Sequence, residues 1–232
     1  MRGSPVSPLV KICGLSTPAT LAAAIAAGAD RVGFVFFPKS PRHVTVAAAA
    51  RLAQAARGRA AVVALVVDAD DDTLAAIVAG VRPDMLQLHG RETPGRVAAV
   101  RARFGRPVIK ALGVSTPGDL GPLQDYAAVA DEILFDAKPP PGAPLPGGNG
   151  RAFDWHMLAG LDLAAPFMLS GGLGPDNVGE AVRLTRAPAV DVSSGVESAP
   201  GVKDPDLIAA FVAAARAAAG APRHPRLQEL QP

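Results

Sequence analysis

The chain has 232 residues, of which 49% are hydrophobic, 4% aromatic and 19% charged, and its formal net charge is +2. This length suits one large domain, and the hydrophobic content excludes a chain that is disordered throughout. Basic residues are scattered, so the charge does not argue for nucleic acid, although it is compatible with a small anionic substrate. No apolar run approaches the length of a membrane span, so we expect no membrane partner.

The single cysteine, Cys13, and the two ends of the chain bear on location and domain limits. One cysteine cannot form an internal disulfide, which favours a reduced thiol and a cytoplasmic protein. Residues 1–8 contain prolines where a secretory signal needs an apolar stretch, so we predict a flexible lead-in there. Residues 220–232 are predicted to be a flexible tail, which leaves residues 9–219 as one catalytic domain.

Short apolar runs alternate along the chain with alanine-rich amphipathic stretches. The first run, LVKIC at residues 9–13, precedes an expected helix at 17–28, which Thr17 can cap and Gly28 can end. The later runs predict strands at residues 31–37, 61–68, 85–89, 107–114, 132–138, 166–172 and 189–195. The stretches between and after them predict helices near residues 45–57, 71–79, 93–104, 116–127, 154–161, 175–185 and 205–219.

Eight strand–helix units in succession predict a parallel sheet whose outer face is covered by helices. In a chain of this length they favour a closed (β/α)8 TIM barrel over the alternative, a doubly wound open sheet. Catalytic residues of such barrels lie at the carboxyl ends of the strands. The last residues of each strand are therefore the place to look for chemistry.

Side chains of a strand alternate in direction, so polar residues spaced two apart share a face. In LVKIC, Val10 and Ile12 suit the helix-covered outside, which turns the lysine and the cysteine inward. The same argument applies to the strands that contain MLQLH, EILFDAK and AVDVSSG. The polar side chains predicted to converge inside the barrel are Lys11, Cys13, Gln87, His89, Asp136, Asp191 and Ser193.

Each of these residues alone has an ordinary structural explanation. A lone cysteine is most often a small buried hydrophobe, Asp136 could be a cap, and His89 could be a satisfied rim residue. Their shared placement favours catalysis instead. A lysine beside Cys13 favours the thiolate by charge, and a carboxyl in a closed pocket tends to keep the proton that a general acid donates.

Two glycine-containing loops follow the seventh and eighth predicted strands, in LSGGLGPDN and VDVSSGVES. Barrel enzymes often bind phosphate at this pair of loops, where glycine lets backbone N–H groups approach the oxygens and a following helix favours the anion. Two ordinary turns are the alternative. The predicted phosphate-binding residues are Ser170, Gly171, Gly172, Ser193, Ser194 and Gly195.

The segment from Ala137 to Trp155 is much longer than the other predicted loops. Long loops of compact barrels are often lids, and glycines can act as their pivots, although a floppy insertion is the alternative. The predicted lid residues are Gly147, Gly148, Asn149 and Gly150.

Taken together, VKICG, GADRVGFVFFPKSPRHV, LQLHG, FDAK with PGGNGRAFDW, LSGGL and VDVSSGVE form a specific set of motifs. Over residues 9–218 the chain resembles the phosphoribosylanthranilate isomerases of tryptophan biosynthesis. The resemblance implies a TIM barrel and an Amadori rearrangement. In that reaction N-(5-phosphoribosyl)anthranilate becomes 1-(2-carboxyphenylamino)-1-deoxyribulose 5-phosphate.

The resemblance also implies a role for individual residues. Cys13 matches the general base, Asp136 the general acid, Arg42 the partner of the anthranilate carboxylate, and Asp191 a polar residue near the ribose. Lys11, Gln87 and His89 complete the expected substrate-binding set, and the two glycine loops match the phosphate site. No cofactor or metal is expected, because the iminium formed from the substrate is itself the electron sink.

Three alternatives remain at this stage. The histidine-pathway ribotide isomerase of the same barrel type uses an aspartate as base and holds two phosphates. A ribulose-phosphate epimerase would need metal-ligating histidines at several strand ends, whereas His89 is the only histidine expected at one. A barrel that binds a phosphosugar without catalysis is the third. Monomer and homodimer are both open.

Overall fold

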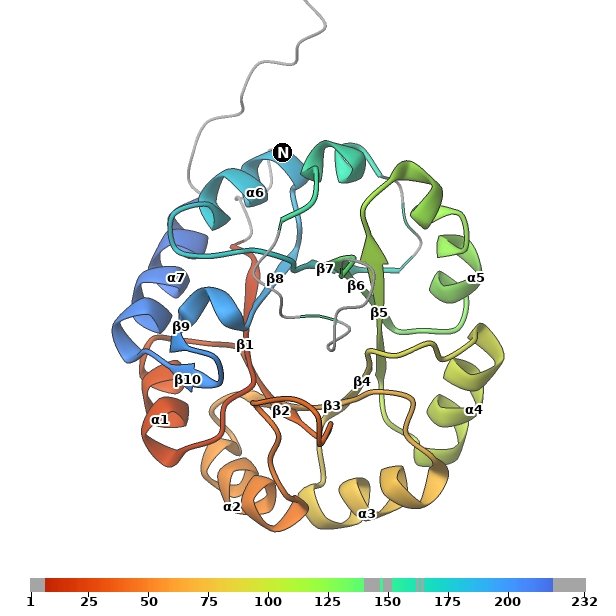
Figure 1. Ribbon diagram of the computed structural model, residues 1–232, viewed down its shortest axis with the longest axis vertical. Coiled ribbons are helices and arrows are strands. Elements are labelled where there is room, and N and C mark those ends of the chain that lie inside the picture. The colour runs from red at the N-terminus through yellow and green to blue at the C-terminus, as the bar shows by residue number, and fades with distance from the viewer. Residues whose placement is uncertain (1–6, 140–146, 148–151, 162, 164, 219–232) are drawn as a thin grey trace, which may run out of the picture.

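The computed structural model describes residues 7–139, 147, 152–161, 163 and 165–218. Eight parallel strands form a closed barrel in chain order, because β8 pairs with β1 through Leu9–Ala189 and Lys11–Asp191. Figure 1 looks along the barrel and shows the helices as a ring around it. The predicted TIM barrel is confirmed, and the open-sheet alternative is wrong because the sheet has no free edge.

The observed elements follow the predicted order. The barrel strands are β1 (Leu9–Cys13), β2 (Arg31–Val35), β3 (Ala61–Val66), β4 (Met85–Leu88), β5 (Val108–Val114), β6 (Glu132–Ala137), β7 (Phe167–Leu169) and β8 (Ala189–Val192). The α-helices are α1 (Pro18–Ala26), α2 (Val46–Ala56), α3 (Asp71–Val81), α4 (Pro94–Phe104), α5 (Leu123–Ala127), α6 (Val178–Thr185) and α7 (Pro205–Ala218). Short 3-10 turns are η1 (Pro117–Leu120), η2 (Trp155–Leu158) and η3 (Ser194–Val196).

Side-chain caps begin the first four helices. The hydroxyls of Thr17, Thr45 and Thr93 and the carboxylate of Asp70 each accept a hydrogen bond from a backbone N–H three residues later. Such caps satisfy N–H groups that have no partner within the helix. The start of each of these helices is therefore encoded locally.

Three predicted helices differ from the observed elements. The helix expected at 116–127 is divided into η1 and α5, because Pro122 has no N–H to continue the first turn. The helix expected at 154–161 is only the turn η2, which ends before Gly160 at a φ of 78°. The helix expected at 175–185 begins later, at Val178.

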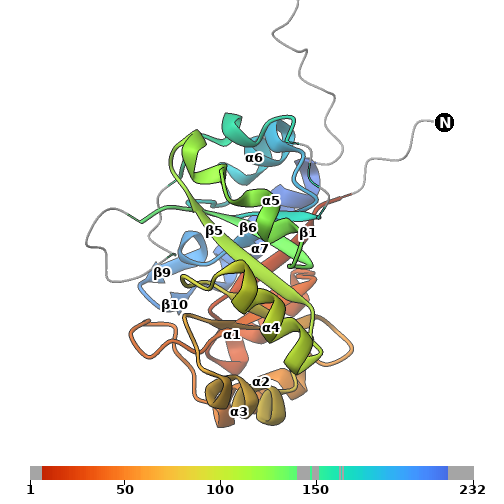
Figure 2. The same ribbon diagram turned by 90° about the vertical axis from the view of Figure 1, so that its right-hand side faces the viewer.

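A hairpin that the sequence analysis did not predict follows η3. Strands β9 (Glu197–Ala199) and β10 (Val202–Lys203) pair antiparallel around a turn that contains Gly201 at a φ of +82°. Figure 2 shows the barrel from the side, with this hairpin at its left-hand end. The hairpin brings Glu197 and Lys203 close to the carboxyl end of β1, as their bonds below show.

The apolar core has two layers separated by the sheet. Between sheet and helices lie one face of each strand and the buried faces of the helices, including Val10, Ile12, Ile133 and Phe135. Inside the barrel lies a smaller cluster of Val63, Ile109, Ala111, Leu134, Met168 and Ala189. This division confirms the predicted alternation in β1 and β6.

The barrel interior also holds charged residues. Lys11 pairs with Asp191 at 2.9 Å, and Arg31 pairs with Glu132 at 2.5 Å. Removing one partner of such a buried pair leaves an uncompensated charge, so these residues constrain one another. They come from β1, β2, β6 and β8 and occupy positions where an apolar layer would otherwise be expected.

Residues 1–6 and 219–232, which include most of the predicted lead-in and the whole predicted tail, lie outside the described residues. The domain limits at residues 9 and 219 therefore stay a prediction. Among the helices of the described residues, none is long and apolar enough to cross a membrane.

Candidate active site

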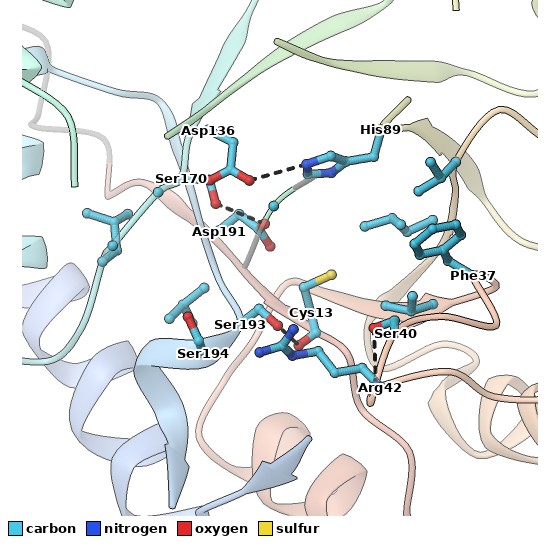
Figure 3. Close-up of a pocket in the computed structure, with 18 residues that line it drawn as sticks. Cys13, Phe37, Ser40, Arg42, His89, Asp136, Ser170, Asp191, Ser193 and Ser194 are labelled. Atoms are coloured by element: carbon cyan, nitrogen blue, oxygen red, sulfur yellow. Dashed lines mark hydrogen bonds and ion pairs between the residues drawn. The ribbon is translucent and has the colours of Figure 1, made fainter. Parts of the chain in front are cut away.

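A pocket at the carboxyl ends of the strands contains about 650 Å³ of empty space, part of it open to solvent. Concave sites at this end of a barrel are where such folds place their chemistry. Figure 3 shows Cys13 and Asp136 on different sides of the pocket, with Asp191 between them in this view. The lining residues are Cys13, Val35, Phe37, Ser40, Arg42, Leu65, Val67, His89, Asp136, Gly147, Ser170, Gly171, Gly172, Leu173, Asp191, Val192, Ser193 and Ser194.

Cys13 ends β1 and is only 3% exposed. Burial raises the pKa of its thiol above the ordinary value, while the positive charges of Lys11 and Lys203 act in the opposite direction. The backbone carbonyl of Cys13 accepts a hydrogen bond from Ser193 Oγ at 3.2 Å. This bond joins the end of β1 to the loop after β8.

Lys11 is fully buried and lies outside the set of residues that line the pocket. Its Nζ donates to Asp191 Oδ1 at 2.9 Å, and Ser170 Oγ donates to Asp191 Oδ2 at 3.3 Å. Burial alone would lower the pKa of Lys11, but Asp191 and Cys13 outweigh it and raise the pKa, so the amine stays charged. The amine is turned to Asp191 outside the pocket lining, and the contact of Lys11 with substrate stays a prediction.

Asp136 lies near the end of β6 and faces His89. The distance from His89 Nε2 to Asp136 Oδ2 is 3.2 Å, and the N–H of Ala137 donates to Asp136 Oδ1 at 2.9 Å. Gln87 Nε2 lies 3.1 Å from His89 Nδ1. Gln87 is fully buried and lies outside the pocket lining, where it contacts the ring of His89. Its predicted contact with substrate stays a prediction.

Gly147 is the one predicted lid residue that falls within the described residues. It lies so close to the Asp136–His89 pair that an added Cβ would collide with Asp136 Oδ2 and His89 Nε2. Glycine at this position therefore allows backbone to approach the acid. Gly148, Asn149 and Gly150 lie outside the described residues.

Both predicted phosphate loops open on the same pocket, through Ser170, Gly171 and Gly172 after β7 and Ser193 and Ser194 after β8. Gly171 has a φ of +81°, and an added Cβ would collide with Ala137 N. The helix expected directly after the first loop begins only at Val178.

Gly195 has a structural role in this arrangement. It is not among the residues that line the pocket, and an added Cβ would collide with the carbonyl oxygen of Leu173. The absence of a side chain thus lets the two loops pack against each other. Asn177 braces the first loop, because its side chain accepts from Gly174 N at 2.8 Å and donates to Gly172 O at 2.9 Å.

An apolar wall faces the polar groups of the pocket. Val35 and Leu65 form a buried cluster with Cys13, and Phe37 and Val67 pack against it. These four side chains come from β2, β3 and the residues that follow them. They give the pocket a surface suited to a flat hydrophobic group.

Arg42 lines the pocket from the segment after β2, and Glu197 binds its guanidinium with two hydrogen bonds. Arg42 is predicted from the sequence as a site residue, whereas Glu197 and Lys203 are not, although both follow the SSG loop closely. The only local signal was an acidic residue two positions after Gly195. Within the described part of the chain, no group of three His, Cys, Asp or Glu residues could hold a metal ion.

The chain matches known proteins along most of its length. The profile of the family described as N-(5'phosphoribosyl)anthranilate (PRA) isomerase matches residues 10–214. The N-(5'-phosphoribosyl)anthranilate isomerase of Rhodopseudomonas palustris strain BisA53 is 67% identical over 208 residues, covering 90% of this chain and 95% of the relative. The protein of the same name from Azorhizobium caulinodans is 63% identical over 222 residues, covering 96% and 97%.

Solved structures give the same result. Phosphoribosyl anthranilate isomerase from Thermotoga maritima superposes with a TM-score of 0.82 at 36% identity, covering 90% of this chain and 99% of that one. A structure of such an isomerase in complex with reduced 1-(o-carboxyphenylamino)-1-deoxyribulose 5-phosphate has a TM-score of 0.78 at 33% identity, with the same coverage. The chain therefore belongs to the N-(5'-phosphoribosyl)anthranilate isomerase family.

Proposed function

We propose that this isomerase converts N-(5'-phosphoribosyl)anthranilate to 1-(2-carboxyphenylamino)-1-deoxyribulose 5-phosphate, a step of tryptophan biosynthesis, with Cys13 as general base and Asp136 as general acid. Family membership supports the reaction. The observation that carries the two roles is that a thiol from β1 and a carboxyl from β6 line one pocket. An acid and a base from distant strands can act on different sides of a sugar ring.

The pocket has a region for each part of this substrate. Arg42 supplies a positive charge for the anthranilate carboxylate, and the apolar wall of Val35, Phe37, Leu65 and Val67 suits the aromatic ring. The loops after β7 and β8 suit the phosphate, because barrels often bind phosphate there. Asp191 lines the same pocket and suits the ribose hydroxyls.

The proposed reaction needs one proton donated and one removed. Asp136 protonates the furanose ring oxygen, and the C1–O bond breaks to give an open-chain iminium. The Cys13 thiolate then takes the proton from C2. The electron pair of that C–H bond forms a C1=C2 double bond, and the π pair of the C=N bond moves to the nitrogen. The resulting enolamine tautomerises to the ketose, so the substrate is isomerised without net oxidation.

The same proposal includes a cytoplasmic location, because Cys13 is a free cysteine that must remain a reduced thiol to act as base. The proposed partner is the small anionic substrate, and the assembly is a monomer or a homodimer. A solved structure at 33% identity is described as that of generated monomers of the dimeric isomerase from Thermotoga maritima. Sedimentation of this protein would distinguish the two assemblies.

The roles can be tested by turnover of phosphoribosylanthranilate, generated in place from anthranilate and phosphoribosyl pyrophosphate, with a metal chelator present. We expect loss of substrate fluorescence with the unchanged protein, and kcat lower by about 10²–10⁴-fold in Cys13→Ser and in Asp136→Asn. The exposed Asp72, on α3, provides the control variant Asp72→Asn, which should keep full activity.

Near-normal turnover by Cys13→Ser would remove the thiol from the reaction. A loss confined to KM in Asp136→Asn would make this carboxyl a binding group. If the folded unchanged protein failed to convert phosphoribosylanthranilate, the histidine-pathway ribotide would be tested next. Binding without product formation would indicate a barrel that has lost catalysis.

A further inference from the structure

Glu197, at the start of the β9–β10 hairpin, is surrounded by hydrogen-bond donors. Its Oε1 accepts from Arg42 Nε at 2.7 Å and from Lys203 Nζ at 2.5 Å. Its Oε2 accepts from Arg42 Nη2 at 2.8 Å and from Gly201 N at 3.1 Å. The Glu197 side chain is 4% exposed, so this bidentate pair is largely shielded from water.

Close backbone packing at two glycines also fixes the position of Arg42 beside Glu197. An added Cβ at Gly14 would lie 2.6 Å from Arg42 Cδ, so the arginine chain runs directly over this glycine. An added Cβ at Gly201 would lie 2.6 Å from Pro41 O, so the hairpin turn packs against the segment that carries Arg42. The position of the guanidinium therefore depends on the hairpin as well as on its own segment.

Lys203 connects this cluster to the catalytic end of β1. Besides Glu197, its Nζ donates to Ser193 O at 2.8 Å and to Ser193 Oγ at 3.2 Å. Ser193 Oγ in turn donates to the carbonyl of Cys13 at 3.2 Å. The hairpin thus joins the arginine, the loop after β8 and the strand of the proposed base.

The charges of the cluster suit an anionic ligand. Burial opposes ionisation of Glu197, but hydrogen bonds and charge from Arg42 and Lys203 outweigh it and lower the pKa of this carboxyl. Burial lowers the pKa of Lys203, and the charge of Glu197 opposes that shift. With Lys203 protonated, an ionised Glu197 between Arg42 and Lys203 leaves one net positive charge. Without Lys203, the arginine would present a neutral pair to an incoming carboxylate.

We propose that Glu197 is a positioning residue for Arg42, which it orients for the carboxylate of the anthranilate ring, and that Lys203 keeps the cluster positive. This inference rests on the proposed function, because it assigns the carboxylate of that substrate to Arg42. It predicts that Glu197 contributes to binding of the carboxylate and not to binding of the rest of the substrate.

The test compares two ligands by calorimetric titration: reduced 1-(o-carboxyphenylamino)-1-deoxyribulose 5-phosphate and its phenylamino counterpart without the carboxylate. For Glu197→Gln we expect binding of the first ligand to weaken about 10-fold, since a charge-assisted bidentate pair is lost. Binding of the second should stay unchanged. In turnover, KM should rise more than kcat falls. The exposed Glu180, on α6, gives the control Glu180→Gln, with neither effect.

Two further variants separate positioning from general damage. In an Arg42→Ala background, Glu197→Gln should cause no additional loss, because its effect acts through the arginine. Lys203→Met should weaken the carboxylated ligand more than its counterpart; any loss common to both ligands reports the contacts of Lys203 with Ser193. This variant gives an independent test if Glu197→Gln does not fold.

Equal weakening of both ligands by Glu197→Gln would overturn the positioning role in favour of a structural one. Tighter binding of the carboxylated ligand would also overturn it, because Glu197 would then compete with the substrate for Arg42. If the unchanged protein neither bound these ligands nor converted phosphoribosylanthranilate, the proposed function would fail first. If the unchanged protein bound both ligands and turned over phosphoribosylanthranilate, and Glu197→Gln behaved in the same way, only the positioning role of Glu197 would be overturned.

Discussion

Cys13 is subject to opposing influences at the scale of single residues. Burial raises the pKa of the thiol, whereas Lys11 and Lys203 lower it by their positive charge. A general base must be deprotonated, so kcat/KM should increase as the pH rises through the pKa of this thiol. The lysines bring that pKa closer to neutral pH than burial alone would allow.

Replacing Lys203 by Met should therefore raise the pKa of Cys13 further and move the rising limb of the kcat/KM profile to higher pH. The thiolate can be followed directly by its ultraviolet absorbance, because the chain has a single cysteine. The Cys13→Ser variant supplies the blank, including the contribution of the single tyrosine. A shift of the titration to lower pH in Lys203→Met would show that Lys203 does not assist ionisation.

The residues of the site differ in how far they can be predicted. Cys13 and Asp136 follow from strand alternation, because neighbouring apolar residues must face the helices. Lys11 and Gln87 share the inward face by the same rule, yet depth along the barrel places them below the pocket. The partnership of Arg42 with Glu197 spans 155 residues, so no local spacing could reveal it.

At the scale of elements, α2 and α3 pack closely at Gly80. An added Cβ at this position would lie 2.5 Å from Val46 Cγ1. Glycine within a helix normally costs about 1 kcal/mol relative to alanine, but overpacking costs about 1–3 kcal/mol. The balance at Gly80 therefore depends on the side chain of Val46.

We expect Gly80→Ala to lower the free energy of unfolding by about 1 kcal/mol, because the lost space outweighs the gain in helix propensity. In a Val46→Ala background the same substitution should become neutral or stabilising. Denaturant unfolding of the two single variants and the double variant measures this coupling. Stabilisation by Gly80→Ala alone would mean that the helices separate at little cost.

The agreement between predicted and observed helix boundaries depends on whether a local side-chain interaction marks the start of the helix. Thr17, Thr45, Asp70 and Thr93 mark helix starts that were predicted to within a few residues, because a side-chain cap is a local interaction. The stretch around Pro122 reads as one amphipathic run, yet the missing N–H divides it. The β9–β10 hairpin is too short to give a clear alternation pattern in the sequence. It is recognised only in the structure, through its pairing and its contacts with Arg42 and Ser193.

At the scale of the whole molecule, Arg216 of α7 holds together segments that lie far apart in the sequence. Arg216 Nη1 donates to Pro8 O at 2.6 Å, and its Nη2 donates to Asp30 Oδ2 at the same distance. Asp30 Oδ2 also accepts from Val10 N at 2.7 Å. These bonds tie the last helix to the first strand and to the turn before β2.

A chain ending at Ala218 retains all of α7 and the contacts of Arg216. Because the sequence predicts a flexible tail after this point, we expect the shorter chain to keep full turnover and a free energy of unfolding within about 0.5 kcal/mol of the full chain. A chain that ends before Arg216 should be clearly less stable. Thermal unfolding and turnover of both chains test this, and lost activity in the longer one would assign a role to residues 219–232.

The sequence by itself determined the order of strands and helices, the parallel barrel they favour and the inward faces that carry Cys13 and Asp136. Those features arise from periodicity and local caps, which act over a few residues. Only the tertiary structure decided that β8 closes on β1, that Lys11 pairs with Asp191, and that Glu197 and Lys203 surround Arg42. These outcomes depend on burial and on charges brought together from distant parts of the chain, and a buried charge is stable only beside its partner.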